Sequence, residues 1–188
     1  SDIMTWQVAR ESIDARDKLN IFMVYTVDFT TNSQISSKTA KKHRCNVYKH
    51  IERHAPISGN ECLTGRPVVI GFGPCGIFAA LELSHNGYRP IVIERGKTMS
   101  ARVKDVENFR QHGVLDGDSN ILFGEGGAGT FSDGKLTSGI KDPNIKFVLE
   151  TFAGAGAGDE IVYKHKPHIG TDVLRAVIVS LREQILDL

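Results

Sequence analysis

The sequence predicts a mixed α/β protein, in which a small α+β domain precedes an incomplete βαβ domain. Three observations predict this fold class. Residues 67–96 read as strand, glycine turn, helix and strand; residues 20–29 alternate as a strand does; and a second glycine-rich loop spans 120–136. We therefore expect one domain with its linker at 1–66 and the other at 67–188.

The first domain is predicted to contain one helix and one strand. Trp6, Ala9 and Ile13 are spaced to share one face of a helix over 6–16. Residues 20–29 predict a strand whose apolar side carries Ile21, Met23, Tyr25, Val27 and Phe29. One helix and one strand cannot close a sheet alone, so we expect this domain to lack its beginning or to borrow strands from elsewhere.

The rest of the first domain is predicted to be largely irregular. Residues 30–46 are polar and basic, which favours a solvated loop; nucleic-acid contact is the weaker alternative because no aromatic platform accompanies the charges. Residues 47–51 predict a short strand or a turn of helix. Residues 56–66, rich in Gly, Ser and Pro, predict a linker.

The βαβ unit begins with the β-branched run Val68–Ile70, which predicts a buried parallel strand. Gly71, Gly73 and Gly76 then form G-x-G-x-x-G. In a dinucleotide-binding turn the first glycine allows the sharp bend, the second lets the backbone approach a pyrophosphate, and the third lets helix and strand pack closely. The helix from about Cys75 to His85 would direct its free N–H groups and positive dipole end at that pyrophosphate.

The second strand, 89–93, ends at Glu94, which comes 18 residues after Gly76, where a ribose-binding carboxylate is expected. A carboxylate there favours an unphosphorylated ribose, because it would repel a 2′-phosphate. FAD and NAD both fit this pattern. Cys75 is either a reactive thiol or, more simply, a small residue that fits the turn.

Two later segments carry further candidate ligand contacts. A polar helix over 100–111 presents Arg102 and Lys104, which either contact phosphate or form a solvated face. In loop 120–136, glycines alternate with Thr130, Ser132 and Lys135. Such a loop exposes backbone N–H groups and can wrap a flat or charged ligand, although a merely flexible loop is the alternative. In a flavin site, a cation such as Lys135 would stabilise the reduced anion.

The C-terminal part predicts two amphipathic helices, over 142–153 and 172–186, the second with Thr171 as its N-cap. Residues 154–158 predict a C-cap and loop, and 161–163 a brief strand. His165 and His168 are expected to be surface histidines and not metal ligands. A further strand is expected to follow the last helix.

Composition limits the function classes. The chain has 188 residues, is 40% hydrophobic and has a net charge of +1, which gives no drive towards nucleic acid or a membrane surface. No apolar run reaches transmembrane length. The three cysteines have no C-x-x-C spacing, which indicates a reducing, cytoplasmic setting and argues against a disulfide framework or a metal site.

Four segments resemble FAD-dependent oxidoreductases of the glutathione-reductase-like superfamily, and more closely the bacterial family of uncharacterised FAD-dependent dehydrogenases. The segments are 69–80, 93–96, 123–135 and 166–172. Residues 12–16, together with the strand that follows them, resemble the small N-terminal domain of that family. The resemblance covers most of the chain, and 123–135 is its most specific part.

The resemblance implies a Rossmann-like FAD-binding domain, of which this chain would be the N-terminal portion. It implies that Gly71, Gly73, Pro74, Cys75 and Gly76 hold the FAD pyrophosphate, with Arg102 nearby. Glu94 would bind the adenosine ribose and Arg95 would flank the adenine. The residues that would lie along the ribityl chain and isoalloxazine ring are Gly126, Gly127, Ala128, Gly129, Thr130, Ser132 and Lys135.

The resemblance also implies the chemistry and the partners. No residue matches a redox disulfide pair, so hydride or electron transfer would rest on the flavin, and no catalytic residue can be named. The implied partners are a small-molecule substrate, NAD(P)H as a candidate, and the C-terminal part of such a flavoprotein or a second copy of this chain. Two alternatives stay open: an NAD-binding module of a non-flavin enzyme, and a non-catalytic remnant that associates with a partner chain.

Overall fold

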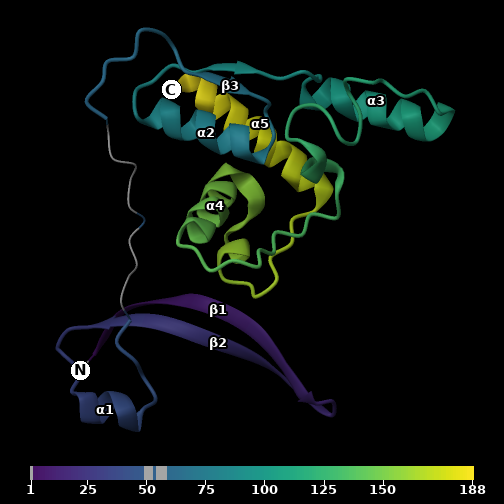
Figure 1. Ribbon diagram of the computed structural model, residues 1–188. Coiled ribbons are helices and arrows are strands. Elements are labelled where there is room, and N and C mark those ends of the chain that lie inside the picture. Colours follow the sequence, from purple (N-terminus) through teal and green to yellow (C-terminus); the bar gives the residue numbers. More distant parts are fainter. Residues whose placement is uncertain (1, 49–52, 54–58) are drawn as a thin grey trace.

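The computed structural model of the chain describes residues 2–48, 53 and 59–188. It is a mixed α/β structure with an N-terminal antiparallel hairpin, followed by a small parallel strand pair among helices (Figure 1). The strands are β1 (Ile3–Asp17), β2 (Asn20–Thr31), β3 (Val68–Ile70) and β4 (Ile91–Ile93). The α-helices are α1 (Ser37–Lys42), α2 (Pro74–His85), α3 (Met99–His112), α4 (Asn144–Phe152) and α5 (Thr171–Asp187).

The helix predicted over 6–16 is wrong, because these residues form β1, which pairs antiparallel with β2. An irregularity in the pairing between Val8 and Arg10 inserts one extra residue into β1. Such a bulge shifts the alternation of side chains by one position. Trp6 and Ile13 therefore share a face despite their odd spacing, and the broken alternation imitates the spacing of a helix.

The strand predicted over 20–29 is confirmed as β2, which runs on to Thr31. The basic segment after it is not wholly a loop, because 37–42 form α1. Ser36 caps this helix by accepting a hydrogen bond from the Thr39 N–H at 3.1 Å. Val47 and Tyr48 have no regular structure; the rest of the element predicted at 47–51, and much of the linker, lie outside the described residues.

The predicted βαβ unit is confirmed, since β3 and β4 pair in parallel and α2 connects them. Among the described residues the parallel sheet has only these two strands. The prediction of a buried strand holds for one face only. Val69 and Val92 are half-buried, and the opposite face, made of Val68, Ile70, Ile91 and Ile93, is exposed.

The hydrophobic core lies mainly between α2 and α5, with residues around α4 closing it (Figure 1). Its buried members include Ile77, Leu81, Ile161, Ile169, Leu174, Val177, Ile178 and Leu181. The helices predicted for α3, α4 and α5 are confirmed, apart from the N-cap of α5, which is Gly170 and not Thr171.

The brief strand predicted at 161–163 is also wrong. Ile161 lies in a 3₁₀ turn over Asp159–Val162, and it is buried in the core. The N–H groups of Tyr163 and Lys164 both donate to the carbonyl of Glu160, at 3.3 and 3.0 Å, which closes the turn. A short apolar run does not distinguish a strand from a buried helical turn.

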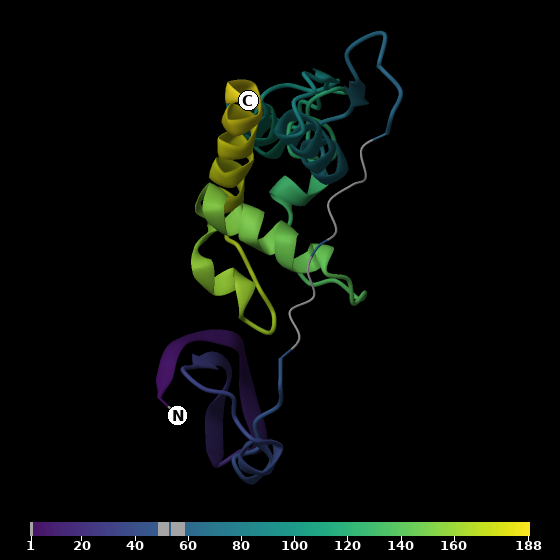
Figure 2. The ribbon, with the colours of Figure 1, turned by 90° about the vertical axis from the view of Figure 1, so that its left-hand side faces the viewer.

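Segment 163–169 connects the hairpin to the rest of the molecule. The Glu11 N–H of β1 donates to the Tyr163 carbonyl at 2.8 Å, and the His165 N–H donates to the Glu11 carbonyl at 3.0 Å. Further along the same segment, the Ile169 N–H donates to the Gly134 carbonyl at 2.9 Å. Both views show the hairpin at one end of the structure and β3 with α2 at the other (Figures 1 and 2).

Within the described part of the chain, no helix combines the length and the apolar character that crossing a membrane requires.

Gly134 is expected to be essential for the contact between the second glycine loop and segment 163–169. Its φ is +74°, and an added Cβ would lie 1.6 Å from the Ile169 carbonyl oxygen. We predict that Gly134→Ala lowers the free energy of unfolding by about 1–3 kcal/mol, because the backbones must separate. Gly139→Ala is the matched control, since its Cβ would meet no atom of the described part of the chain within 4 Å. Equal urea midpoints for the two variants would contradict the prediction.

Candidate functional site

The two glycine loops singled out in the sequence lie directly against each other. The Gly126 N–H donates to the Phe72 carbonyl at 2.8 Å. A Cβ added to Gly127 would lie 3.2 Å from the Gly73 Cα. The loop after β3 and the loop after α3 therefore form one surface made largely of backbone.

A hollow of about 520 Å³ lies at the carboxyl ends of β3 and β4. Ligands of open α/β sheets bind at this edge. The hollow is lined by Ile70, Gly71, Ile93, Glu94, Arg95, Leu122, Phe123, Gly124 and Gly127. Gly73, the N-cap of α2, lies beside Gly127. The N–H groups of Cys75 and Gly76, in the first turn of α2, have no acceptor within the helix.

Glu94 fastens the first glycine turn to the end of β4. Its Oε2 accepts a hydrogen bond from the Phe72 N–H at 2.6 Å, and its Oε1 accepts one from the Gly96 N–H at 2.9 Å. An ionised carboxylate has about four lone-pair sites, so each oxygen retains capacity for a further donor. Glu94 can therefore hold the turn and still accept hydroxyl groups from a ligand in the hollow.

Arg95 and Phe123 form one flat wall of the hollow. The Arg95 guanidinium carbon lies 3.9 Å from the centroid of the Phe123 ring. Arg95 also lies 3.4 Å from an Asp118 carboxylate oxygen, where both side chains are exposed. Such an exposed cation–π contact is worth about 0.5–1 kcal/mol. The stacked guanidinium and phenyl ring therefore present planar groups at the edge of the hollow.

Arg102 takes neither of the two roles predicted for it. It is fully buried, and it is not among the residues that line the hollow. Its three guanidinium nitrogens donate to five carbonyl oxygens, at 2.7–3.3 Å, of Asn120, Ile121, Gly124, Glu125 and Gly127. We therefore remove Arg102 from the candidate cofactor contacts: it is the internal support of the second glycine loop.

Burial lowers the pKa of Arg102, and the charges of Glu94 and Glu125 oppose this shift. Arginine nevertheless remains a cation in proteins. The Arg102 side chain also explains why residue 124 is a glycine, because a Cβ there would lie 2.6 Å from the Arg102 Cδ.

Glu125 and Arg182 are structural residues that sequence reasoning missed. Glu125 is only 3% exposed, and its carboxylate accepts hydrogen bonds from the Met99 N–H at the start of α3 and from Arg182 of α5, the latter at 2.8 and 2.9 Å. The carboxylate thus ties the loop to both helices. The available signal was a single acidic residue among glycines, where a surface loop has no need of one.

The remaining predicted site residues are divided between interior and surface. Gly126 and Thr130 are buried, and a Cβ on Gly126 would lie 2.3 Å from the Thr130 Oγ1. Lys135 is exposed and pairs with Asp133 at 2.7 Å. The structure brings Gly71, Gly73, Glu94, Arg95 and Gly127 together. The predicted residues that stay exposed outside the hollow are Pro74, Cys75, Ala128, Gly129, Ser132 and Lys135.

The described residues contain no group of three or more His, Cys, Asp or Glu side chains that could hold a metal ion.

Comparison with known proteins identifies a longer relative. No protein-family model matches the sequence. A protein of Clostridium beijerinckii, described as an uncharacterized protein, is 44% identical over 185 residues. The alignment covers 98% of this chain and 35% of that protein, so the chain spans about a third of the length of the curated relative it matches.

Replacing Arg102 tests its role as an internal support. We predict that Arg102→Met lowers the free energy of unfolding by about 3–5 kcal/mol, because five carbonyls lose their charged donor in a buried place. Lys104→Met is the control, since Lys104 is an exposed cation on the same helix. Chemical denaturation followed by circular dichroism measures both. An equally small loss in the two variants would contradict the role.

The loop that contains Asp116 is expected to lose stability in acid. The pKa of Asp116 is lowered, first by the hydrogen bond from Lys97 and then by the N–H groups of Asp118 and Ser119. Its stabilising contribution is therefore present above the ordinary carboxyl pKa and is lost as the pH falls through the lowered value. We predict that Asp116→Asn reduces stability at neutral pH and makes it less dependent on pH in the acid range. Parallel acid profiles would contradict this.

Proposed function

We propose that this chain provides the dinucleotide-binding corner of an FAD-dependent oxidoreductase. The observation that carries the proposal is the hollow at the carboxyl ends of β3 and β4, formed by backbone of both glycine loops and bordered by Glu94. Its volume of about 520 Å³ is within the range of small-molecule sites. Because glycines line it, a ligand can approach main-chain N–H groups closely.

The pyrophosphate would rest at the start of α2. The N–H groups of Cys75 and Gly76 and the positive end of the helix dipole suit an anion there. Gly73 gives this anion access, since among the described residues the only atom within 4 Å of an added Cβ would be the Gly127 Cα, at 3.8 Å. This space is compatible with a phosphate close to the backbone.

The nucleoside would extend along the end of β4. Glu94 has lone pairs available for the two ribose hydroxyls, and its charge disfavours a 2′-phosphate. The flat wall of Arg95 and Phe123 offers a surface on which a planar base can stack. These features suit the ADP half that FAD and NAD share.

The second glycine loop favours FAD over NAD. It contacts the first glycine turn directly. Its exposed positions Ala128, Gly129, Ser132 and Lys135 are those that the resemblance assigns to the ribityl chain and isoalloxazine ring, which NAD lacks. A bound flavin would accept and release the hydride or electrons. This chain's residues would bind and orient it, and Lys135 would contribute a positive charge.

We also propose that β3, α2 and β4 are part of a Rossmann-like domain. A Rossmann-like domain places further strands beside the two seen here, and the longer Clostridium relative has the length to include them. A small-molecule substrate and NAD(P)H remain the proposed partners, and a cytoplasmic location remains a prediction. An NAD-binding module of a non-flavin enzyme is the alternative, because Glu94 suits NAD equally well.

A single methyl group tests the proposal. We predict that Gly73→Ala weakens FAD binding at least tenfold, because the Cβ would stand between the backbone and the pyrophosphate, while thermal stability is nearly unchanged. Gly139→Ala should bind FAD like the parent chain. Quenching of flavin fluorescence during titration measures both. Equal affinity for Gly73→Ala would move the pyrophosphate elsewhere, and tight NADH binding without FAD binding would favour the NAD module.

A further inference from the structure

The turn that ends α2 contains a chemically labile pair of residues. Asn86 is followed by Gly87, and this is the only Asn-Gly step in the sequence. Asparagine deamidates most readily before glycine, because glycine has no side chain to hinder attack of its backbone nitrogen on the asparagine amide carbon. Both residues are exposed, so solvent reaches the pair.

Deamidation at this pair needs only water. The Gly87 nitrogen loses its proton and attacks the Asn86 Cγ; the N–Cγ bond forms, the Cγ–Nδ2 bond breaks, and the amide nitrogen leaves as ammonia with that proton. Water then opens the resulting succinimide ring and leaves aspartate or isoaspartate at position 86. The reaction therefore depends on no ligand, no partner and no segment outside this chain.

The folded backbone engages the attacking nitrogen. Gly87 has a φ of +79° and turns the chain out of the helix. Its N–H donates to the Ser84 carbonyl at 3.0 Å, and the Tyr88 N–H donates to the Leu83 carbonyl at 3.0 Å. These two bonds form the Schellman motif that closes a helix. Attack on the side chain requires the Gly87 nitrogen to leave this motif.

The leaving amide is held as well. The Asn86 Nδ2 donates to the Glu82 carbonyl at 2.8 Å, and the Asn86 N–H donates to the same carbonyl at 3.2 Å. Ring closure must therefore break bonds on both sides of the reacting atoms. The pair can react only when the end of α2 opens, and such openings are a minor state of a folded chain.

The product of the reaction no longer fits the end of the helix. A carboxylate at position 86 has no N–H for the Glu82 carbonyl, and it places a negative charge at the negative end of the helix dipole. An isoaspartate linkage also adds one carbon to the main chain within the Schellman motif. Because α2 supplies Ile77 and Leu81 to the core, we expect the loss to reach the βαβ unit.

We propose that Asn86 is the deamidation site of this chain, that the end of α2 protects it in the folded state, and that its modification destabilises α2 irreversibly. Each opening of the helix end gives the reaction an opportunity, and a modified chain cannot return to the original structure. The pair therefore converts transient opening into a permanent loss of stability.

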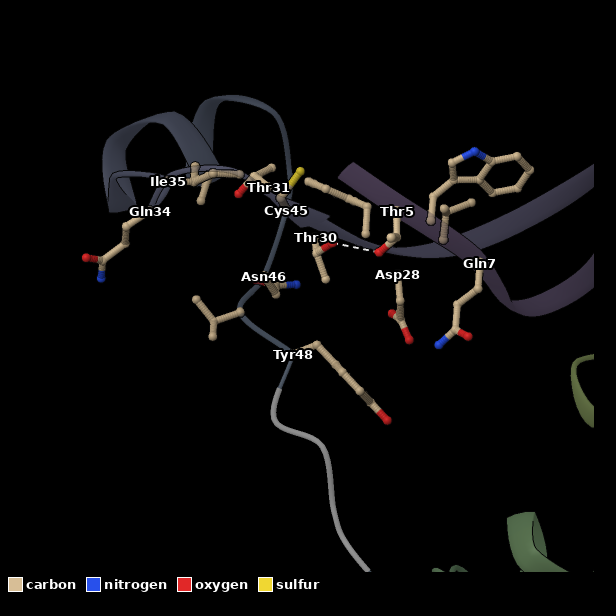
Figure 3. A pocket seen from close by; sticks show the side chains of 15 residues that line it. Thr5, Gln7, Asp28, Thr30, Thr31, Gln34, Ile35, Cys45, Asn46 and Tyr48 are labelled. Atoms are coloured by element: carbon tan, nitrogen blue, oxygen red, sulfur yellow. Dashed lines mark hydrogen bonds between the residues drawn. The ribbon is translucent and has the colours of Figure 1, made fainter. Parts of the chain in front are cut away.

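Exposure alone does not select the site. Asn46 is also exposed, on a segment without regular structure, and Figure 3 shows it beside the hollow on the polar side of the hairpin. Val47 follows it, and a β-branched side chain hinders the approach of its own backbone nitrogen to the asparagine amide. Asn46 is therefore the internal reference against which Asn86 is compared.

Peptide mapping by mass spectrometry measures the rates. The chain is incubated at mildly alkaline pH, in buffer and in urea, beside a free peptide with the sequence of residues 82–90. In urea the chain should deamidate at Asn86 as fast as the peptide and before Asn46. In buffer the folded chain should react at least about tenfold more slowly than the peptide, since a minor open state is populated at a tenth or less.

Two variants test the consequence of the modification. Asn86→Ala removes the side-chain hydrogen bond, and Asn86→Asp also adds the charge of the product. We expect urea midpoints to fall in the order parent chain, Asn86→Ala, Asn86→Asp. Asn108→Asp is the matched control, because Asn108 is exposed near the end of α3 and receives the same charge. Its midpoint should stay close to that of the parent chain.

Three outcomes would overturn the proposal. Equal rates for the folded chain and the free peptide in buffer would exclude protection by the fold. Faster modification of another asparagine in urea would exclude Asn86 as the site. Equal midpoints for Asn86→Asp and Asn108→Asp would exclude the loss of stability. None of these measurements involves FAD, so they test this proposal independently of the proposed function.

Discussion

The buried guanidinium of Arg102 is the constraint on which the candidate site depends. A loop rich in glycine has few side chains to fix its path and a large conformational entropy to lose on ordering. Arg102 offsets this by gathering five carbonyls of the loop around one rigid, planar cation. With its carbonyls turned inward, the loop can present its glycine backbone to the hollow.

Two carboxylates, together with Arg102, hold the two glycine loops in place. Glu125 joins the loop to the start of α3, at Met99, and to Arg182 of α5. Glu94 holds the first glycine turn against the end of β4. Each of these groups bonds mainly to backbone or to an opposite charge. The walls of the hollow are consequently in place before any ligand arrives, and a preorganised site loses less free energy to ordering when it binds.

Periodicity and glycine spacing were sufficient to predict the parts of the fold with strong local signals, namely the βαβ unit, β2, and helices α3 to α5. They failed where the local sequence pattern did not reflect contacts made with distant parts of the chain. The bulge in β1 gave Trp6 and Ile13 a helical spacing, and the apolar run at Ile161 carried no information on strand or turn. Arg102 was a polar residue on a polar helix, and nothing in the sequence distinguishes a solvated arginine from one enclosed by a loop 18–25 positions away. For the two glycine loops, the sequence predicted a shared role in binding a ligand, but it did not predict that they contact each other.

Segment 163–169 is hydrogen-bonded to β1 at one end and to the second glycine loop at the other. These bonds make the segment a short mechanical link between two otherwise distant parts of the chain. A shift of β1 along its own axis would lengthen the hydrogen bonds at Glu11 or move residues 163–165 with it. The hairpin and the second glycine loop are thus linked through main-chain hydrogen bonds, and these bonds do not depend on which side chains the segment carries.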